Sequence, residues 1–103
     1  MRGISGGGLT LLGWAYIDTG RWDEALDVAA EAASLSEANQ MEIVTASADV
    51  ITATVLAMRA DSSAARRHAN RALATVDPAE CGLVAARARR ALGVAAQQVD
   101  VAL

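Results

Sequence analysis

Two neighbouring motifs decide the fold: Leu12-Gly13-Trp14-Ala15-Tyr16 and, after a short gap, Gly20-Arg21-Trp22-Asp23-Glu24-Ala25-Leu26. Each motif is typical of a helix, and Gly20 favours a tight turn between them because glycine readily adopts positive φ. The small residues Gly13, Ala25 and Ala32 allow two helix backbones to approach closely, whereas the larger Leu12, Tyr16 and Leu26 fill the remaining space. The stretch therefore predicts a helical hairpin, which is the unit of helical-repeat proteins.

The composition predicts a single all-α domain. The chain has 103 residues, of which 53% are hydrophobic and only 3% aromatic. A chain of this length holds one modest core, and a core of Ala, Leu and Val requires helices that pack closely. All nine basic residues are arginine, which indicates the GC-rich genome of a bacterium.

Hydrophobic periodicity and capping residues predict five helices in a domain over residues 9–103, after a flexible glycine-rich leader at 1–8. The first two span about 9–18 and 22–35. The third begins at the capping box Asn39-Gln40-Met41-Glu42 and runs to about Ala60. It is apolar around most of its circumference, which predicts neighbours on several sides, although its β-branched residues leave a strand over 50–56 as the alternative.

The fourth and fifth helices are predicted from their capping residues. Asp61-Ser62-Ser63 favours a helix over about 63–75, and Asp77-Pro78-Ala79-Glu80 favours one from Pro78 to about Gln98.

The sequence matches itself at intervals of 40 residues. A shift of 40 places Gly20 on Ala60 and brings three alanines into register, namely Ala25, Ala29 and Ala32 with Ala65, Ala69 and Ala72. A shift of 80 places Leu12-Gly13 on Leu92-Gly93. The pattern predicts two and a half hairpins, in which the fifth helix is the first helix of a third unit.

This pattern resembles the tetratricopeptide repeat, whose L-G-x-x-Y, A and A positions are met by Leu12, Gly13, Tyr16, Ala25 and Ala32. The second unit departs from the family, with Thr52-Ala53 in place of Leu-Gly. The blocks 12–35 and 68–93 also resemble the helical arm of the large actinobacterial regulators of the LuxR/MalT type. The resemblance implies a fragment of a right-handed α-solenoid that senses a partner or effector, or holds subunits together, with DNA contacted only by other domains of a parent transcriptional regulator.

The tetratricopeptide resemblance also implies a concave groove lined by the first helices of successive hairpins. The positions that it carries over are Trp14, Ile17, Ser47, Val50, Thr54, Arg87, Arg90, Val94 and Gln97. An aromatic ring at one end and two arginines at the other would suit a peptide segment with an apolar anchor and an acid. The alternative to a regulator arm is a stand-alone scaffold that binds a peptide or small ligand in this groove.

The fifth helix carries an apolar stripe that the predicted register leaves uncovered. Its members are Ala88, Leu92, Ala95 and Val99. Because exposed apolar stripes are rare on soluble monomers, we expect the isolated chain to form a homodimer in which this stripe packs on its copy across a two-fold axis.

Charge is distributed unevenly, with most arginines after residue 58 and most acids before residue 50. Nucleic-acid binding through the arginine-rich half is a weaker alternative, because the net charge is −3 and that half lacks aromatic residues. A row of acids at Asp23, Asp27 and Glu31 is expected to be a solvated helix face.

No pattern predicts catalysis, a cofactor or a metal site. Nothing pairs a nucleophile with a base, and the phosphate-binding loop motif is missing. His68 is expected on the surface, and Cys81 as a half-buried thiol in the first turn of the fifth helix. A single cysteine allows no internal disulfide and favours the cytoplasm, while the most apolar window, 43–58, is too short to span a membrane.

Overall fold

The computed structural model describes residues 6–39, 42–77, 79 and 81–102. Every regular element in this part is a helix, so the all-α prediction is confirmed and the alternative of a strand over 50–56 is wrong. The helices, in chain order, are α1 (Gly6–Asp18), α2 (Trp22–Asn39), α3 (Glu42–Met58), α4 (Ser62–Thr75) and α5 (Gly82–Ala102).

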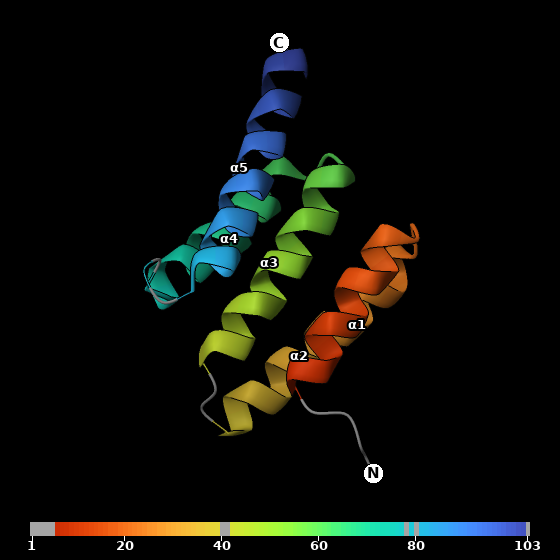
Figure 1. Cartoon of the computed structure of the whole chain (residues 1–103). Coiled ribbons are helices and arrows are strands. Elements are labelled where there is room, and N and C mark those ends of the chain that lie inside the picture. The colour runs from red at the N-terminus through yellow and green to blue at the C-terminus, as the bar shows by residue number, and fades with distance from the viewer. Residues whose placement is uncertain (1–5, 40–41, 78, 80, 103) are drawn as a thin grey trace.

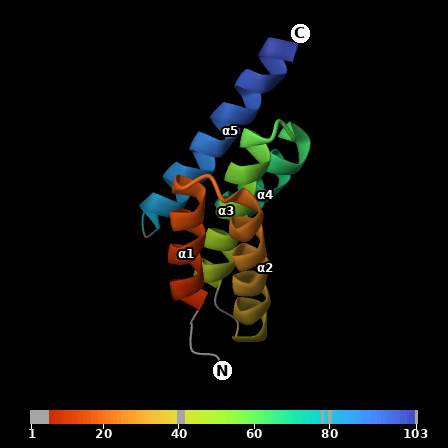
Figure 2. The same cartoon turned by 90° about the vertical axis from the view of Figure 1, so that its right-hand side faces the viewer.

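Helix α3 lies at the centre of the molecule, with α1 and α2 on one side and α4 and α5 on the other (Figure 1). Successive helices pack against each other, and α3 also contacts both α1 and α5. Helices α2 and α4 do not meet within the described residues. The C-terminal end of α5 projects beyond the other helices (Figure 2). The first, third and fifth helices therefore form one continuous row.

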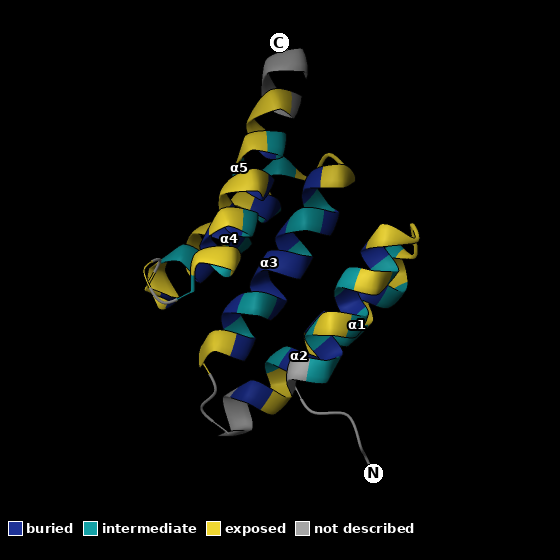
Figure 3. Ribbon diagram, in the orientation of Figure 1, coloured by how far each residue is buried: buried dark blue, intermediate teal, exposed yellow. Residues whose placement is uncertain are grey.

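Burial along α3 reflects its central position (Figure 3). Ile51 is the largest fully buried side chain among the described residues, with 0% of its surface exposed. The buried residues of α3 are Val44, Ala46, Ala48, Asp49, Val50, Ile51, Ala53, Val55 and Ala57. The prediction that this helix has neighbours on several sides is confirmed.

Small residues let the helices approach closely, as the sequence predicts. A Cβ atom added at Gly13 would lie 2.9 Å from Ile51 Cδ1 and 3.2 Å from Val28 Cγ2. Helix α1 therefore has no spare room for a side chain where it meets α2 and α3. Ala25 and Ala65, which occupy the same place in their two hairpins, are 0% and 1% exposed.

The two hairpin turns have the same structure, 40 residues apart. Gly20 and Ala60 both adopt positive φ, 78° and 66° respectively. In each turn the amide of this residue bonds to the carbonyl three residues earlier, and the following amide bonds to the carbonyl five residues earlier. This hydrogen-bond pattern is typical of a helix that ends at a residue in the left-handed conformation. The 40-residue shift that matches Gly20 with Ala60 in the sequence therefore also matches the structures of the two turns.

Replacing Ala60 with glycine is expected to raise the free energy of unfolding. A left-handed alanine costs about 1–2 kcal/mol, and the extra freedom of glycine in the unfolded chain offsets about 0.4–1 kcal/mol, which leaves a gain of roughly 0.5–1 kcal/mol. Urea denaturation measures the change. The matched control is Gly20→Ala, where a Cβ would meet no atom within 4 Å, so that only the backbone is strained. A loss of stability in Ala60→Gly would contradict the prediction.

The start of α3 differs from the prediction. Asn39 is the last residue of α2, and α3 begins at Glu42, so Asn39 belongs to the preceding helix and is not the residue directly before α3. The other two residues of the predicted capping box, 40 and 41, lie outside the described part. Helix α1 begins at Gly6, so residues 6–8, which were predicted to belong to a flexible leader, are helical.

The start of α5 also differs, whereas the cap of α4 is confirmed. Asp61 accepts a hydrogen bond from the Ala64 amide through its carboxylate, at 3.3 Å. Helix α5 begins at Gly82 and is preceded by a turn at Asp77. In this turn the Asp77 carboxylate accepts a hydrogen bond from the Ala79 amide at 2.9 Å, and its carbonyl oxygen accepts one from the Cys81 amide at 2.8 Å. Pro78 and Glu80, on which the prediction depended, lie outside the described residues.

Candidate functional site

A pocket of about 280 Å³ lies between α1, α3 and α5, and we call it the α1–α3–α5 pocket. The six predicted groove residues that line it are Trp14, Ile17, Thr54, Arg87, Arg90 and Val94. The lining also includes Asp18, Ala57, Met58 and Ala91. The row of first, third and fifth helices thus brings together residues that are as far as 80 positions apart in the sequence.

The contact between Trp14 and Arg87 defines the chemistry of one wall. Trp14 is half-buried, because its ring packs against the core on both sides of α3. The Arg87 guanidinium carbon lies 4.1 Å from the centre of the Trp14 ring, which is cation–π geometry. Stacking holds the guanidinium plane in place while its N–H edge remains able to bind an anion. Since the backbones of α1 and α5 are not in contact, this side-chain pair spans the gap between them.

The pocket combines two cationic groups with apolar walls. Within the described residues, neither Arg87 nor Arg90 forms an ion pair with a carboxylate of this chain. Ile17, Met58 and Val94 supply apolar surface. Asp18 adds one carboxylate to the lining. A lining of this composition has the chemistry to bind an anionic group attached to an apolar body.

Three of the predicted groove residues do not line the pocket. Val50 is 1% exposed and belongs to the core where α3 meets α4 and α5. Ser47 is half-buried one turn before Val50 and Gln97 is exposed beyond Val94, and both lie outside the lining. The physical reason is that α5 packs directly over α3 near Val50, so the pocket lies beside the C-terminal half of α3.

The prediction that the apolar stripe of α5 is exposed and available for self-association is wrong. Ala88 and Ala95 are 0% exposed, since α5 packs on α3 and α4 with this face. Leu92 is half-buried against the same core. The side chain of Val99 lies outside the described part. The open face of α5 lies elsewhere, at Gly93, where an added Cβ would meet no atom within 4 Å.

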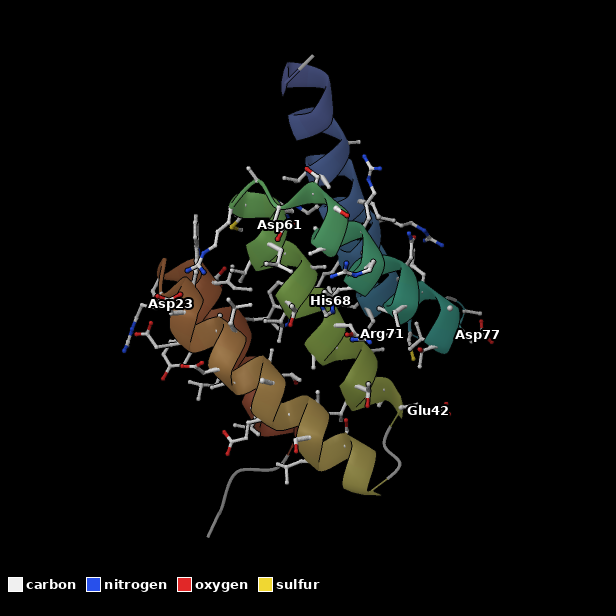
Figure 4. The ribbon with its side chains drawn as sticks, turned by 180° about the vertical axis from the view of Figure 1, so that it is seen from behind. Asp23, Glu42, Asp61, His68, Arg71 and Asp77 are labelled. Atoms are coloured by element: carbon white, nitrogen blue, oxygen red, sulfur yellow. The ribbon has the colours of Figure 1, made fainter. Side chains whose placement is uncertain are left out.

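A half-buried polar cluster between α3 and α4, centred on a buried carboxylate, was not predicted (Figure 4). Asp49 is 5% exposed and accepts hydrogen bonds from Arg71 through both carboxylate oxygens, with Nε to Oδ2 at 2.9 Å. His68 Nδ1 lies 3.1 Å from Asp49 Oδ1. His68 is therefore partly buried, and the expectation of a surface histidine is wrong. The available signal was a carboxylate, Asp49, in the middle of an apolar helix, together with a His-x-x-Arg pair on the next helix.

The remaining candidates agree with the prediction in part. Asp23, Asp27 and Glu31 are exposed, as expected of a solvated face, and Asp23 pairs with Arg59 at 2.7 Å. Cys81 is half-buried, but it lies just before α5 rather than in its first turn, and its carbonyl accepts a hydrogen bond from the Ala85 amide.

At the turn between α1 and α2, Arg21 stacks on Tyr16 and bonds to Glu24 at 2.7 Å. This hydrogen bond is the main cause that lowers the pKa of Glu24.

Across the described residues, no three His, Cys, Asp or Glu side chains gather as a metal site would require, and none of the helices has the length and apolar character needed to cross a bilayer. No protein-family model matches the sequence, and comparison with curated proteins and with solved structures gives no match.

Proposed function

We propose that this protein is a non-catalytic interaction module that binds a partner or effector in the α1–α3–α5 pocket. The observation that carries the proposal is the pocket itself, with Arg87 stacked on Trp14 and Arg90 beside an apolar lining. We further propose that the module is the tetratricopeptide-like arm of a cytoplasmic regulator of the LuxR/MalT type, in which other domains contact DNA.

The packing supports a hairpin-repeat arrangement. Helices α1, α3 and α5 stack in succession while α2 and α4 stay apart, as expected when the first helices of successive hairpins line one face. The identical turns at Gly20 and Ala60 support the same register. In this interpretation the chain is two and a half units of a right-handed α-solenoid.

The pocket chemistry defines the partner that it fits. An apolar side chain would fill the space beside Ile17 and Val94, and a carboxylate on the same partner would bind Arg87 and Arg90. Arginine presents a fork of N–H donors that matches a carboxylate, and the Trp14 ring fixes the orientation of one such fork. The partner is therefore a peptide segment in which an acid lies close to a large apolar residue.

Selection of peptides from a random 12-residue display library tests the proposal. The expected result is enrichment of sequences that contain Asp or Glu near a large apolar residue. The selected peptides are then titrated against the double variant Arg87→Gln/Arg90→Gln, which should weaken binding at least tenfold. The matched control is Arg66→Gln/Arg67→Gln, which removes the same charge from the exposed side of α4 and should leave affinity unchanged.

Two outcomes would overturn the proposal. If both double variants weaken binding equally, the peptides respond to net charge rather than to the pocket. If no acidic peptide is enriched, or the enriched peptides bind the pocket variant as well as the unchanged chain, the pocket is not the interaction site. Circular dichroism of each variant confirms that the helices are retained.

A further inference from the structure

The size of the α1–α3–α5 pocket points to a specific class of ligand. An apolar cavity of about 150 Å³ holds one benzene molecule, so a pocket of about 280 Å³ accepts a ligand of roughly ten to twelve non-hydrogen atoms. This volume lies just below the usual range of about 300–1,000 Å³ for small-molecule sites, so only a short part of a peptide would fit. The pocket fits a compact ligand or the end of a longer one.

The charges of the lining select among compact ligands. Arg87 and Arg90 contribute two positive charges and Asp18 one negative charge, which leaves the lining with a net positive charge at neutral pH. A single carboxylate can bind Arg87 in a bidentate manner, because stacking on Trp14 already fixes the guanidinium plane and little side-chain entropy is lost. Asp18 would repel a second carboxylate. The lining therefore favours a monoanion.

The apolar part of the lining defines the rest of the ligand. Ile17, Ala57, Met58 and Val94 come from all three helices and surround the space next to the arginines. Met58 is 40% exposed at the end of α3, and its flexible side chain can adapt to different shapes. An unbranched or aromatic hydrocarbon body would cover this surface, whereas a sugar or nucleotide would leave its hydroxyl groups without partners.

We propose that the α1–α3–α5 pocket binds a small apolar monocarboxylate as an effector, with its carboxylate on Arg87 and Arg90 and its hydrocarbon body against Ile17, Met58 and Val94. The inference rests on the proposed function, since it specifies the ligand of the same pocket. Bound between α1 and α5, whose backbones are not in contact, such a ligand would tie the first hairpin to the last helix. The effector would thus stabilise one relative position of these helices.

Two carboxylates and their neutral counterparts serve as probes. Octanoate and 3-phenylpropionate each have about ten non-hydrogen atoms, and octanamide and 3-phenylpropionamide keep the shape without the charge. Titrations of the full chain are followed by ¹H–¹⁵N NMR. We expect shifts at the Trp14 indole and at the amides of Thr54 and Val94, with dissociation constants of about 0.1–1 mM for the acids, the range reached by ligands of this size. The amides should bind at least tenfold more weakly.

Three variants test the assignment of roles. Arg87→Gln should weaken binding of both acids at least tenfold, and Val94→Phe should abolish binding by filling the pocket without changing any charge. Arg66 is an exposed arginine of α4 that lies outside the pocket lining. The control variant Arg66→Gln should therefore bind both acids with the same affinity as the unchanged chain. The dispersion of the NMR spectrum shows whether each variant is folded.

Each outcome decides for or against the inference. Equal affinity for acids and amides would overturn the role of the arginines, and shifts that map away from the pocket residues would overturn the site. If neither acid binds at millimolar concentration while selected acidic peptides bind through Arg87 and Arg90, the inference fails and the proposed function stands. If the acids bind but no peptide does, the inference stands and the proposal of a peptide partner fails.

Discussion

Replacing Ile51 with alanine is expected to lower the free energy of unfolding by about 3–5 kcal/mol, because truncating a large buried aliphatic side chain loses apolar burial and leaves a cavity. Ile51 lies on the central helix α3 with none of its surface exposed, and its Cδ1 atom lies against Gly13 of α1. Four of the other eight buried residues described in its core cluster are alanines, whose short side chains cannot move in to fill the space. A domain typically has only about 5–15 kcal/mol of stability, so the loss is a large fraction of the total.

The matched control for this substitution is Ile43→Ala. Both residues are isoleucines of α3, but Ile43 is 50% exposed at the start of the helix. Its truncation should cost less than about 1 kcal/mol, since surface substitutions rarely exceed that range. Urea denaturation followed by circular dichroism at 222 nm measures both variants. Equal losses in the two would show that Ile51 is not the centre of the core.

The sequence predicted the all-α fold and the two hairpin turns because local signals and spacing agreed. Gly20 and Ala60 occupy the same turn position 40 residues apart, and the structure gives both the left-handed conformation. Gly13 was predicted at a close helix approach, and the structure leaves no spare room for a side chain there. Periodicity and turn chemistry are properties of the chain itself, so they can be determined without knowledge of the packing.

The pocket was predicted only in part. The 40-residue repeat indicates which residues share a face of the molecule, but it does not indicate how the helices cross. Trp14, Thr54 and Val94 were assigned to one surface from their repeat positions, and all three line the pocket. Val50 was assigned to the same surface but is covered by α5. How much of α3 is covered by α5 depends on the angle at which the two helices cross, and side-chain packing determines that angle.

The face with which α5 packs was assigned incorrectly for a similar reason. Ala88 and Ala95 form a plausible stripe for a partner, and the sequence does not distinguish a stripe that packs within the chain from one that packs on a copy. In the structure both are fully buried against α3 and α4. The repeat register misled here because it suggested that a missing helix would cover this face.

The cluster of Asp49, His68 and Arg71 could not be predicted because its members are 19 and 22 residues apart and meet only after α3 and α4 pack. The cluster leads to the second large expected effect. Arg71→Ala should lower the free energy of unfolding by about 2–4 kcal/mol, because Asp49 would remain buried with only His68 as a partner and a buried charge without compensation is costly. Arg67→Ala, on an exposed position of the same helix, should change stability by less than about 0.5 kcal/mol.

A second substitution distinguishes the cost of a buried, uncompensated charge from the loss of a favourable contact. If the destabilisation of Arg71→Ala arises from the buried Asp49 carboxylate, then adding Asp49→Ala removes the cause, and the double variant should be more stable than Arg71→Ala alone. The single variant Asp49→Ala should be milder than Arg71→Ala, since the Arg71 side chain is 63% exposed and can be hydrated once its partner is removed. Urea denaturation of the three variants and the unchanged chain completes the cycle. A double variant less stable than Arg71→Ala would mean that the buried carboxylate is not the source of the loss.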